Sequence, residues 1–365
     1  MSTPLRSVHF FHFYSVVDRS PSEMGEMSCK ENSCKEKPSQ GLCVEDCSKE
    51  NWSNESSDQV TIKREISWPN VLLFLYLHLS ALYGFFLIFT EAQFKTTLFA
   101  LSLVMVASLG LMAGAHRLWA HHSYVASLPL RIILICCHTL SGQGTVYEWV
   151  RNHRLHHLYF GTKLDPFGVQ KGLLFSHFTC HLIKLHPSTE ELHSQIDMTD
   201  LEADSLVMFQ KRFKWILIPV FCFFLPLNAP MEYWNESIFV SFFVVGFLRF
   251  ALNVNINWLM HSGYNIWGLK AGSRYPSGDD NSVFLVTKTH WPAYHYLMPY
   301  DYRCCEMGGY GTGLVTAFID SHILMGTARD AKTTNTKITM DALKLAAKSG
   351  APLHKCLSDI MSKKS

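Results

Sequence analysis

Two clusters of histidines are the residues of this chain whose types and spacing could do chemistry. The first cluster is His116-Arg-Leu-Trp-Ala-His121, and the second is His153-Arg-Leu-His156-His157. Residues three and four positions apart share one face of a helix, so the three imidazoles of the second cluster converge. Converging imidazoles repel one another when protonated and lose hydration when neutral. A metal ion removes this conflict, because neutral imidazole is a ligand for iron, zinc and copper. The clusters therefore predict a metal site.

The composition restricts the kind of protein that can hold these histidines. The chain has 365 residues, of which 48% are hydrophobic and 17% are charged, whereas soluble domains carry roughly a quarter charged residues. A formal net charge of only +2 argues against a nucleic-acid-binding surface, so no nucleic-acid partner is expected. The 11 cysteines are an odd number spread over a long chain, which is not typical of a secreted disulfide scaffold. These observations predict a polytopic membrane protein.

Four apolar segments are long enough to form membrane-spanning helices. They cover residues 67–90, 96–115, 215–231 and 237–260, and about 20 residues are needed to cross a hydrocarbon core of about 30 Å. Arg249 lies inside the fourth segment, where a charge is expected to face protein or water rather than lipid. Residues 128–140 are too few to span and are predicted to lie at the membrane surface.

The distribution of basic residues predicts the orientation. Lysines and arginines are concentrated between positions 117 and 214 and just before the first segment, whereas the two short links between segments contain only Lys95. By the positive-inside rule, the central region and both termini are cytosolic. All the histidine clusters then lie on the cytosolic side of the membrane.

The two ends of the chain are predicted to flank a membrane domain of residues 63–325. Residues 1–62 are rich in Ser, Glu, Lys and Asn and are expected to be a disordered cytosolic arm, and residues 326–365 a cytosolic tail. Four cysteines of the arm are expected to be reduced thiols, with a zinc site as the alternative: Cys29, Cys34, Cys43 and Cys47. The glycosylation sequons of the arm, at Asn51 and Asn54, are expected to be unmodified.

The histidine clusters and their flanking residues resemble the membrane acyl-CoA desaturases of the stearoyl-CoA, or Delta9, type. The segments that carry the resemblance are Gly114-Ala-His-Arg-Leu-Trp119, Glu148-Trp-Val-Arg-Asn-His-Arg-Leu-His-His157, Asp165-Pro166, Trp258-Leu-Met260, Pro299-Tyr-Asp-Tyr302, Gly308-Gly-Tyr310 and Phe318-Ile-Asp320. The resemblance implies an all-α membrane protein, with four transmembrane helices and a helical cytosolic cap that holds a histidine-rich dimetal site. The cofactor implied is iron, with two irons expected in the family.

The same resemblance implies an oxidoreductase of unsaturated fatty acid biosynthesis in the endoplasmic reticulum membrane. Such an enzyme uses O2 to insert a cis double bond into a long-chain fatty acyl-CoA and takes its electrons from cytochrome b5. Its partners would therefore be acyl-CoA, O2, cytochrome b5 and membrane lipid. The acyl chain must be held so that one carbon pair lies beside the metal, because this positioning selects the product. The residues implied at the CoA end of the substrate are Asn70, Arg151, Lys184 and Trp258.

The third histidine box departs from the family. The family pattern is HNYHH, but counting back from Pro299 this chain has Pro292-Ala-Tyr-His-Tyr296, so one histidine of three remains. His261 and Asn265 stand where the family has Asn and His, in exchanged positions on one helix face. His290 is a further candidate that could take over as a ligand. The expected ligands are His116, His121, His153, His156, His157, His261 and His295, which are compatible with two irons, one or none.

Two functions are compatible with this altered box. The first is a working acyl-CoA desaturase. The second is a catalytically silent relative that binds acyl-CoA or regulates a partner desaturase, because the loss of ligands lowers metal affinity. A histidine-box hydroxylase or a transporter agrees less well with the flanking motifs. Measuring iron per chain would separate the first two, since two irons support the enzyme and none supports the silent relative.

Overall fold

The computed structural model describes residues 65–162, 164–184, 188–268, 283–304, 306, 309–351 and 353–362. They belong to one compact unit that includes residues 65–365. The predicted N-terminal arm, with its cysteines and sequons, lies outside the described residues.

Four helices are long and apolar enough to cross a membrane, among the residues described. They contain 23, 27, 21 and 25 residues and cover Trp68–Thr90, Phe94–Ala120, Lys214–Trp234 and Ile238–Ser262. Each coincides with one of the four apolar segments, and the second helix continues past residue 115 to Ala120. Many apolar side chains on their outer faces are exposed, among them Leu72, Phe85 and Phe89. A helix in contact with lipid requires such a surface.

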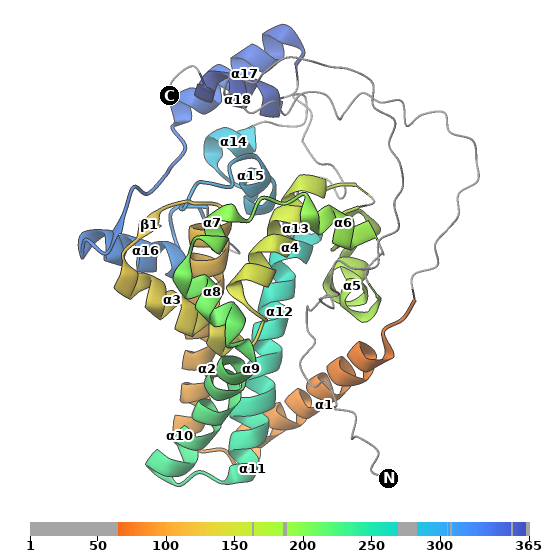
Figure 1. Ribbon diagram of the computed structural model, residues 1–365, viewed down its shortest axis with the longest axis vertical. Helices are drawn as coiled ribbons and strands as arrows, with labels where there is room; N and C mark the ends of the chain where they lie inside the picture. Colours follow the sequence, from red (N-terminus) through yellow and green to blue (C-terminus); the bar gives the residue numbers. More distant parts are fainter. Residues whose placement is uncertain are drawn as a thin grey trace. The chain divides into compact units, whose positions relative to one another are not determined.

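The spans are built from shorter elements (Figure 1). The first is α1 (Trp68–Thr90), and the second is α2 (Phe94–Leu109) followed by the π-helical η1 (Gly110–Ala120). The third comprises α9 (Lys214–Ile218), η4 (Pro219–Phe224) and α10 (Leu225–Trp234). The fourth comprises α11 (Ile238–Val240), η5 (Ser241–Leu248) and α12 (Arg249–Ser262), and it contacts each of the other three spans.

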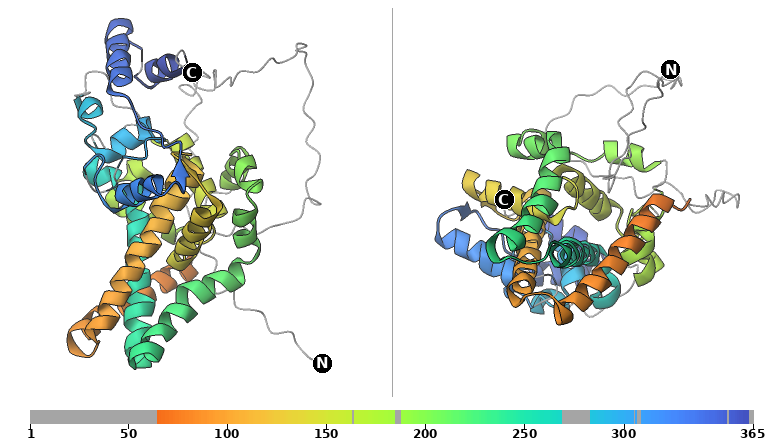
Figure 2. Two further views of the ribbon diagram at one scale, coloured as in Figure 1. Left: turned by 90° about the vertical axis from the view of Figure 1, so that its left-hand side faces the viewer. Right: turned by 90° about the horizontal axis from the view of Figure 1, so that it is seen from below.

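The two links between consecutive spans lie at the same end of the helices. The backbone N–H of Gln93 donates to the Glu236 carboxylate at 2.9 Å, and the Thr96 hydroxyl donates to the same carboxylate. The Trp234 indole N–H also donates to the Thr96 hydroxyl, at 2.8 Å. The opposite ends of α2–η1 and α12 therefore point together toward the remaining helices (Figures 1 and 2).

The remaining helices include α3 (Leu128–Ser141) and α4 (Val146–Tyr159), which follow the second span. Between α4 and the third span lie η2 (Val169–Lys171), η3 (Phe175–Thr179), α5 (Cys180–Leu182), α6 (Ser188–Ser194), α7 (Thr199–Glu202) and α8 (Ser205–Arg212). After the fourth span come α13 (Tyr264–Trp267), α14 (Val283–Thr287), α15 (Trp291–Leu297), α16 (Leu314–Leu324), α17 (Thr336–Ser349) and α18 (Leu353–Ser362). The strands β1 (Val125–Ala126) and β2 (Ala328–Arg329) pair antiparallel.

Close packing between helices accounts for two features, the approach of α3 to the second span and the burial of the Arg249 side chain. Helix α3 packs along the second span at Gly110, where a Cβ atom would lie 2.1 Å from the backbone nitrogen of His138. Arg249 is fully buried, and its guanidinium donates to the carbonyls of Val245, Leu140 and Cys222. Its charge is thus directed into the protein, as expected for an arginine inside a span.

The segment after residue 325, which was predicted to be a tail, packs against the preceding residues. Strand β2 pairs with β1, and the backbone N–H of Lys332 donates to the carbonyl of Ser123 at 2.8 Å. Buried residues of α17 and α18, such as Ala342 and Leu357, share one hydrophobic core with Tyr294 of α15. This core lies beside the histidine-bearing face of α15.

Candidate metal centre

Three segments far apart in the sequence bring histidines together. His116 lies in η1 and His121 directly follows it, while His153 lies on α4 and His295 on α15. Helix α4 begins at a capping box, in which the side chains of Thr145 and Glu148 each bond the other residue's backbone N–H. This box defines the start of the helix and therefore which of its faces carries the histidines.

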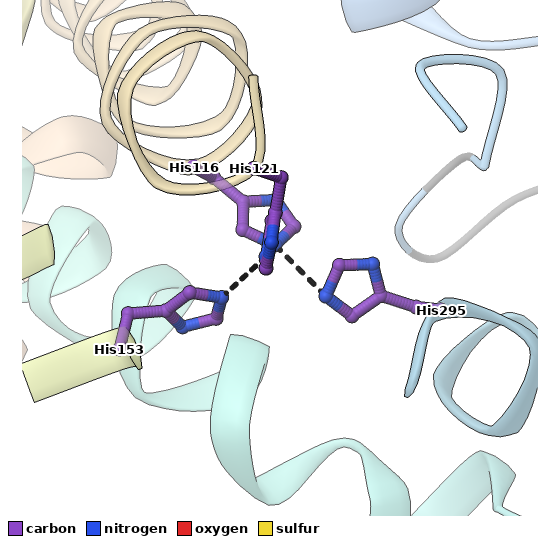
Figure 3. Close-up of side chains that lie close together, drawn as sticks. All are labelled: His116, His121, His153 and His295. Carbon is purple, nitrogen blue, oxygen red and sulfur yellow. Dashed lines mark hydrogen bonds between the residues drawn. The ribbon is translucent and has the colours of Figure 1, made fainter. Parts of the chain in front are cut away.

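The ligand atoms of four histidines lie within 4.8 Å of one another (Figure 3): His116, His121, His153 and His295. We refer to these residues as the four-histidine group. The Nε2 atoms of His116 and His295 are 3.1 Å apart, and those of His121 and His153 are 2.9 Å apart. The Nε2 atom of His157 lies 3.1 Å from that of His295. Two nitrogens bound to one metal ion at about 2.1 Å and at right angles lie about 3.0 Å apart. The three close pairs therefore have the spacing of neighbouring ligands on one ion.

The protonation of these imidazoles also suits a metal. Burial, reinforced by the neighbouring imidazoles, lowers the pKa of His121, His153, His157 and His295 well below the usual value. They are neutral at pH 7, and neutral imidazole is the form that binds metal ions.

Glu306 holds the ring of His116 and was not predicted as a site residue. Its Oε1 atom lies 2.9 Å from His116 Nδ1, and its Oε2 atom accepts from Arg117 Nη2 at 2.7 Å. Burial opposes its ionisation, but Arg117 and His116 outweigh this effect and lower the pKa of Glu306 to about 2. A carboxylate on the outer nitrogen fixes the tautomer and orientation of a metal-binding imidazole. No local motif marks Glu306, because it lies 190 residues from His116 along the chain.

His156 lies outside the four-histidine group and is engaged on both ring nitrogens. Its Nδ1 atom is 2.7 Å from Asp165 Oδ1, and its Nε2 atom is 2.6 Å from the hydroxyl of Tyr296. His156 and Asp165 are fully buried. Burial, followed by the Asp165 carboxylate and Tyr264, raises the pKa of Tyr296 well above its usual value. Tyr296 is therefore a neutral phenol.

His261 approaches the four-histidine group from α12, next to His153. Its Nε2 atom lies 3.3 Å from His153 Nδ1, and its ring stacks on Phe167 with centroids 3.7 Å apart. Asn265, one turn further along the chain, instead donates to the Ser176 hydroxyl at 2.9 Å. Of the two exchanged residues, the histidine is the one that faces the site.

His290 does not join these histidines. It is exposed and precedes α15 in a left-handed conformation, with φ 50°. Pro292 lies in the first turn of α15, where the absence of an N–H group costs no helical hydrogen bond. His295, one turn further along, is the residue of α15 that reaches the four-histidine group.

Three of the four residues expected at the CoA end of a substrate lie in or next to the segment 181–184. The Asn70 amide donates to the carbonyl of His181 at 3.0 Å, and the Trp258 indole stacks on the His181 ring with centroids 4.5 Å apart. Lys184 follows in the same segment, with its exposed ammonium 2.6 Å from Glu65. These contacts join the start of α1 to the end of α12.

Arg151, the fourth expected residue, lies on α4 beside His193 of α6. Burial and the charge of Arg151 lower the pKa of His193 to about 4. Neither ring nitrogen of His193 nor the Nε atom of Arg151 has a hydrogen-bond partner among the described residues, although all three atoms are buried. Two donor groups without acceptors are thus adjacent at this position.

The fold and the site together define a multi-pass helical membrane protein with a histidine cluster able to hold a metal ion. The chain is 44% identical to the acyl-CoA Delta-9 desaturase of Acheta domesticus over 273 residues, 74% of this chain and 76% of that protein. It is 40% identical to the stearoyl-CoA desaturase of Homo sapiens over 272 residues, 74% of this chain and 75% of that protein. No protein-family model matches the chain. The chain belongs to the acyl-CoA desaturase family.

Proposed function

We propose that this protein is an acyl-CoA desaturase, which uses O2 to introduce a cis double bond into a long-chain fatty acyl-CoA. The observation that carries the proposal is the four-histidine group, whose neutral nitrogens lie at ligand spacing in a chain 44% identical to an acyl-CoA Delta-9 desaturase. A silent relative would have no need for an imidazole held in place by a buried carboxylate. The Glu306–His116 contact therefore favours the enzyme.

Iron is the metal that we propose for this site. His116, His121, His153 and His295 would hold it, with His157 beside them. Bound iron would supply the oxidising power that removal of hydrogen from an unactivated methylene requires. The chain's own residues orient His116 through Glu306 and bury His116, His153 and His295, while burial and neighbouring imidazoles keep the ring of His121 neutral.

The CoA end of the substrate is proposed to contact the two groups of polar residues described above. Arg151 and His193 offer donors without acceptors, and a guanidinium matches the geometry of a phosphate. Lys184 adds an exposed positive charge near Asn70 and Trp258. Binding at this end would fix how far the acyl chain extends toward the metal, and so which carbons react.

Localisation and electron supply complete the proposal. We infer that the protein resides in the endoplasmic reticulum membrane with both termini in the cytosol, because basic residues are concentrated between the second and third spans. The histidines then face the cytosol. Cytochrome b5 is the proposed electron donor, because of the family to which the chain belongs.

Expression in a desaturase-deficient host tests the function. Cells kept alive on oleate would be given deuterated stearate, and their lipids would be analysed by mass spectrometry. The parent should produce a deuterated cis-monoene, and His153→Ala should produce none. His122→Ala is the matched control, since His122 is an exposed histidine outside the four-histidine group. A folded, membrane-bound parent that forms no product would favour the silent relative.

A further inference from the structure

We propose that this chain binds one metal ion, in the four-histidine group, and that a hydrogen-bonded triad of Asp165, His156 and Tyr296 replaces the second metal position. The inference deepens the proposed function, because it concerns the metal count of the same site. The family implies a second iron close to the first. The residues around His156, where that second ion would have to bind, do not fit it.

The lone pair that His156 would need for a metal is already used. Its Nδ1–H donates to Asp165 at 2.7 Å, which leaves Nε2 as the unprotonated nitrogen, and this atom accepts the Tyr296 O–H at 2.6 Å. Two donor atoms bound to one ion would lie about 3.0 Å apart. The shorter distance corresponds to a direct hydrogen bond of the O–H type.

Tyr296 is held in this position by aromatic packing. Its ring stacks on Phe160 with centroids 3.7 Å apart and planes inclined by 20°, and the edge of Tyr264 packs against it at 5.7 Å. Phe160 is 1% exposed. The phenol cannot leave His156 without disturbing this stack, so it closes the position rather than covering it loosely.

Asp165 is equally committed to its present contacts. In addition to His156, Oδ1 accepts from the backbone N–H of Phe167 at 3.0 Å, and Oδ2 lies 3.4 Å from the backbone nitrogen of Val169. Turning the carboxylate toward a metal would leave buried N–H groups without acceptors, at a free-energy cost of about 1–3 kcal/mol each. The triad is therefore a self-satisfied polar unit.

His261 lies beside His156, with ring centroids 5.2 Å apart, but is not part of the triad, and its Nδ1 atom is buried without a hydrogen-bond partner among the described residues. Its Nε2 atom faces Nδ1 of His153 at 3.3 Å, and its ring lies flat on Phe167. In this position it can accept the Nδ1–H of His153 and orient that ring, as Glu306 does for His116. We infer that His261 is a positioning residue for the single metal, rather than a ligand of a second.

Metal stoichiometry tests the inference independently of turnover. The parent and the variants Tyr296→Phe and Tyr296→His would be purified in detergent, supplied with Fe(II) without oxygen, desalted and analysed for iron per chain. One iron is expected in the parent and in Tyr296→Phe, which keeps the stacked ring but removes the hydroxyl. More than one is expected in Tyr296→His, which frees the lone pair of His156 and adds an imidazole beside it.

Two results would overturn the inference: two irons in the parent, or a count that stays at one in Tyr296→His. His261→Leu adds a second readout, since loss of an orienting acceptor should weaken the single site about 10- to 100-fold without changing its stoichiometry. A parent that binds one iron and forms no product would contradict the proposed function and leave this inference standing. A parent that binds two irons and forms product would support the proposed function and contradict this inference.

Discussion

Replacing Glu306 with Gln would show how much a buried carboxylate contributes to the metal centre. The substitution keeps the size of the side chain and its ability to accept a hydrogen bond, but it removes the negative charge. Glu306 lies 2.9 Å from His116 and 2.7 Å from Arg117, and none of the three side chains is more than 4% exposed. The removed charge is therefore not replaced by solvent.

Two free energies should change. Breaking a buried ion pair by removing one partner costs about 3–5 kcal/mol. Arg117 keeps the carbonyls of Met112, Tyr302 and Cys304 as acceptors, so we expect the free energy of unfolding to fall by the lower value, about 3 kcal/mol. Loss of the carboxylate that orients His116 should also lower metal affinity about 10- to 100-fold, which corresponds to about 1.4–2.7 kcal/mol.

Thermal unfolding in detergent and chelator competition for bound Zn(II) measure these two quantities. Glu202→Gln is the matched control, because Glu202 is an exposed carboxylate that accepts from the Tyr147 hydroxyl at 2.9 Å, outside the four-histidine group. It should leave metal affinity unchanged. If Glu306→Gln binds Zn(II) as tightly as the parent, the carboxylate does not orient His116 for a metal.

Three further predictions concern the site, the stability and the topology. His121→Ala should lower iron content by at least about tenfold, whereas its exposed neighbour His122 can be changed to Ala without loss, as elemental analysis would show. Burial lowers the pKa of His138 to about 3. Between that pH and about 6.5 the unfolded chain therefore binds one more proton than the folded chain, and the free energy of unfolding decreases by about 1.4 kcal/mol for each unit by which the pH is lowered. His138→Asn cannot be protonated, and it should lose about 2 kcal/mol less than the parent between pH 7 and pH 5; equal losses in thermal unfolding would contradict this. The sequons at Asn51 and Asn54 should carry no glycan. A decrease in mass on endoglycosidase treatment would show that they are glycosylated and would contradict the proposed cytosolic location of the N-terminus.

The sequence by itself determined the features that depend on neighbouring residues. An uncharged apolar run becomes a spanning helix because every backbone group finds its partner within the run, and the four runs coincide with the four long helices. The spacing of His153 and His157 places both on one face of α4 because a helix repeats every 3.6 residues. Membership of the desaturase family was likewise predicted from contiguous motifs, and the relatives confirm it.

Only the tertiary structure decided which of these residues meet. Glu306 orients His116 although the two residues are 190 positions apart in the sequence. His290 lies outside the four-histidine group although it precedes His295 by only a few residues. His156 and His157 are adjacent and of the same type, yet one is bonded to Asp165 and Tyr296 while the other reaches His295. The physical reason is that successive helical residues point about 100° apart. Their partners are therefore set by which helices pack on each side, and local spacing carries no information about that packing.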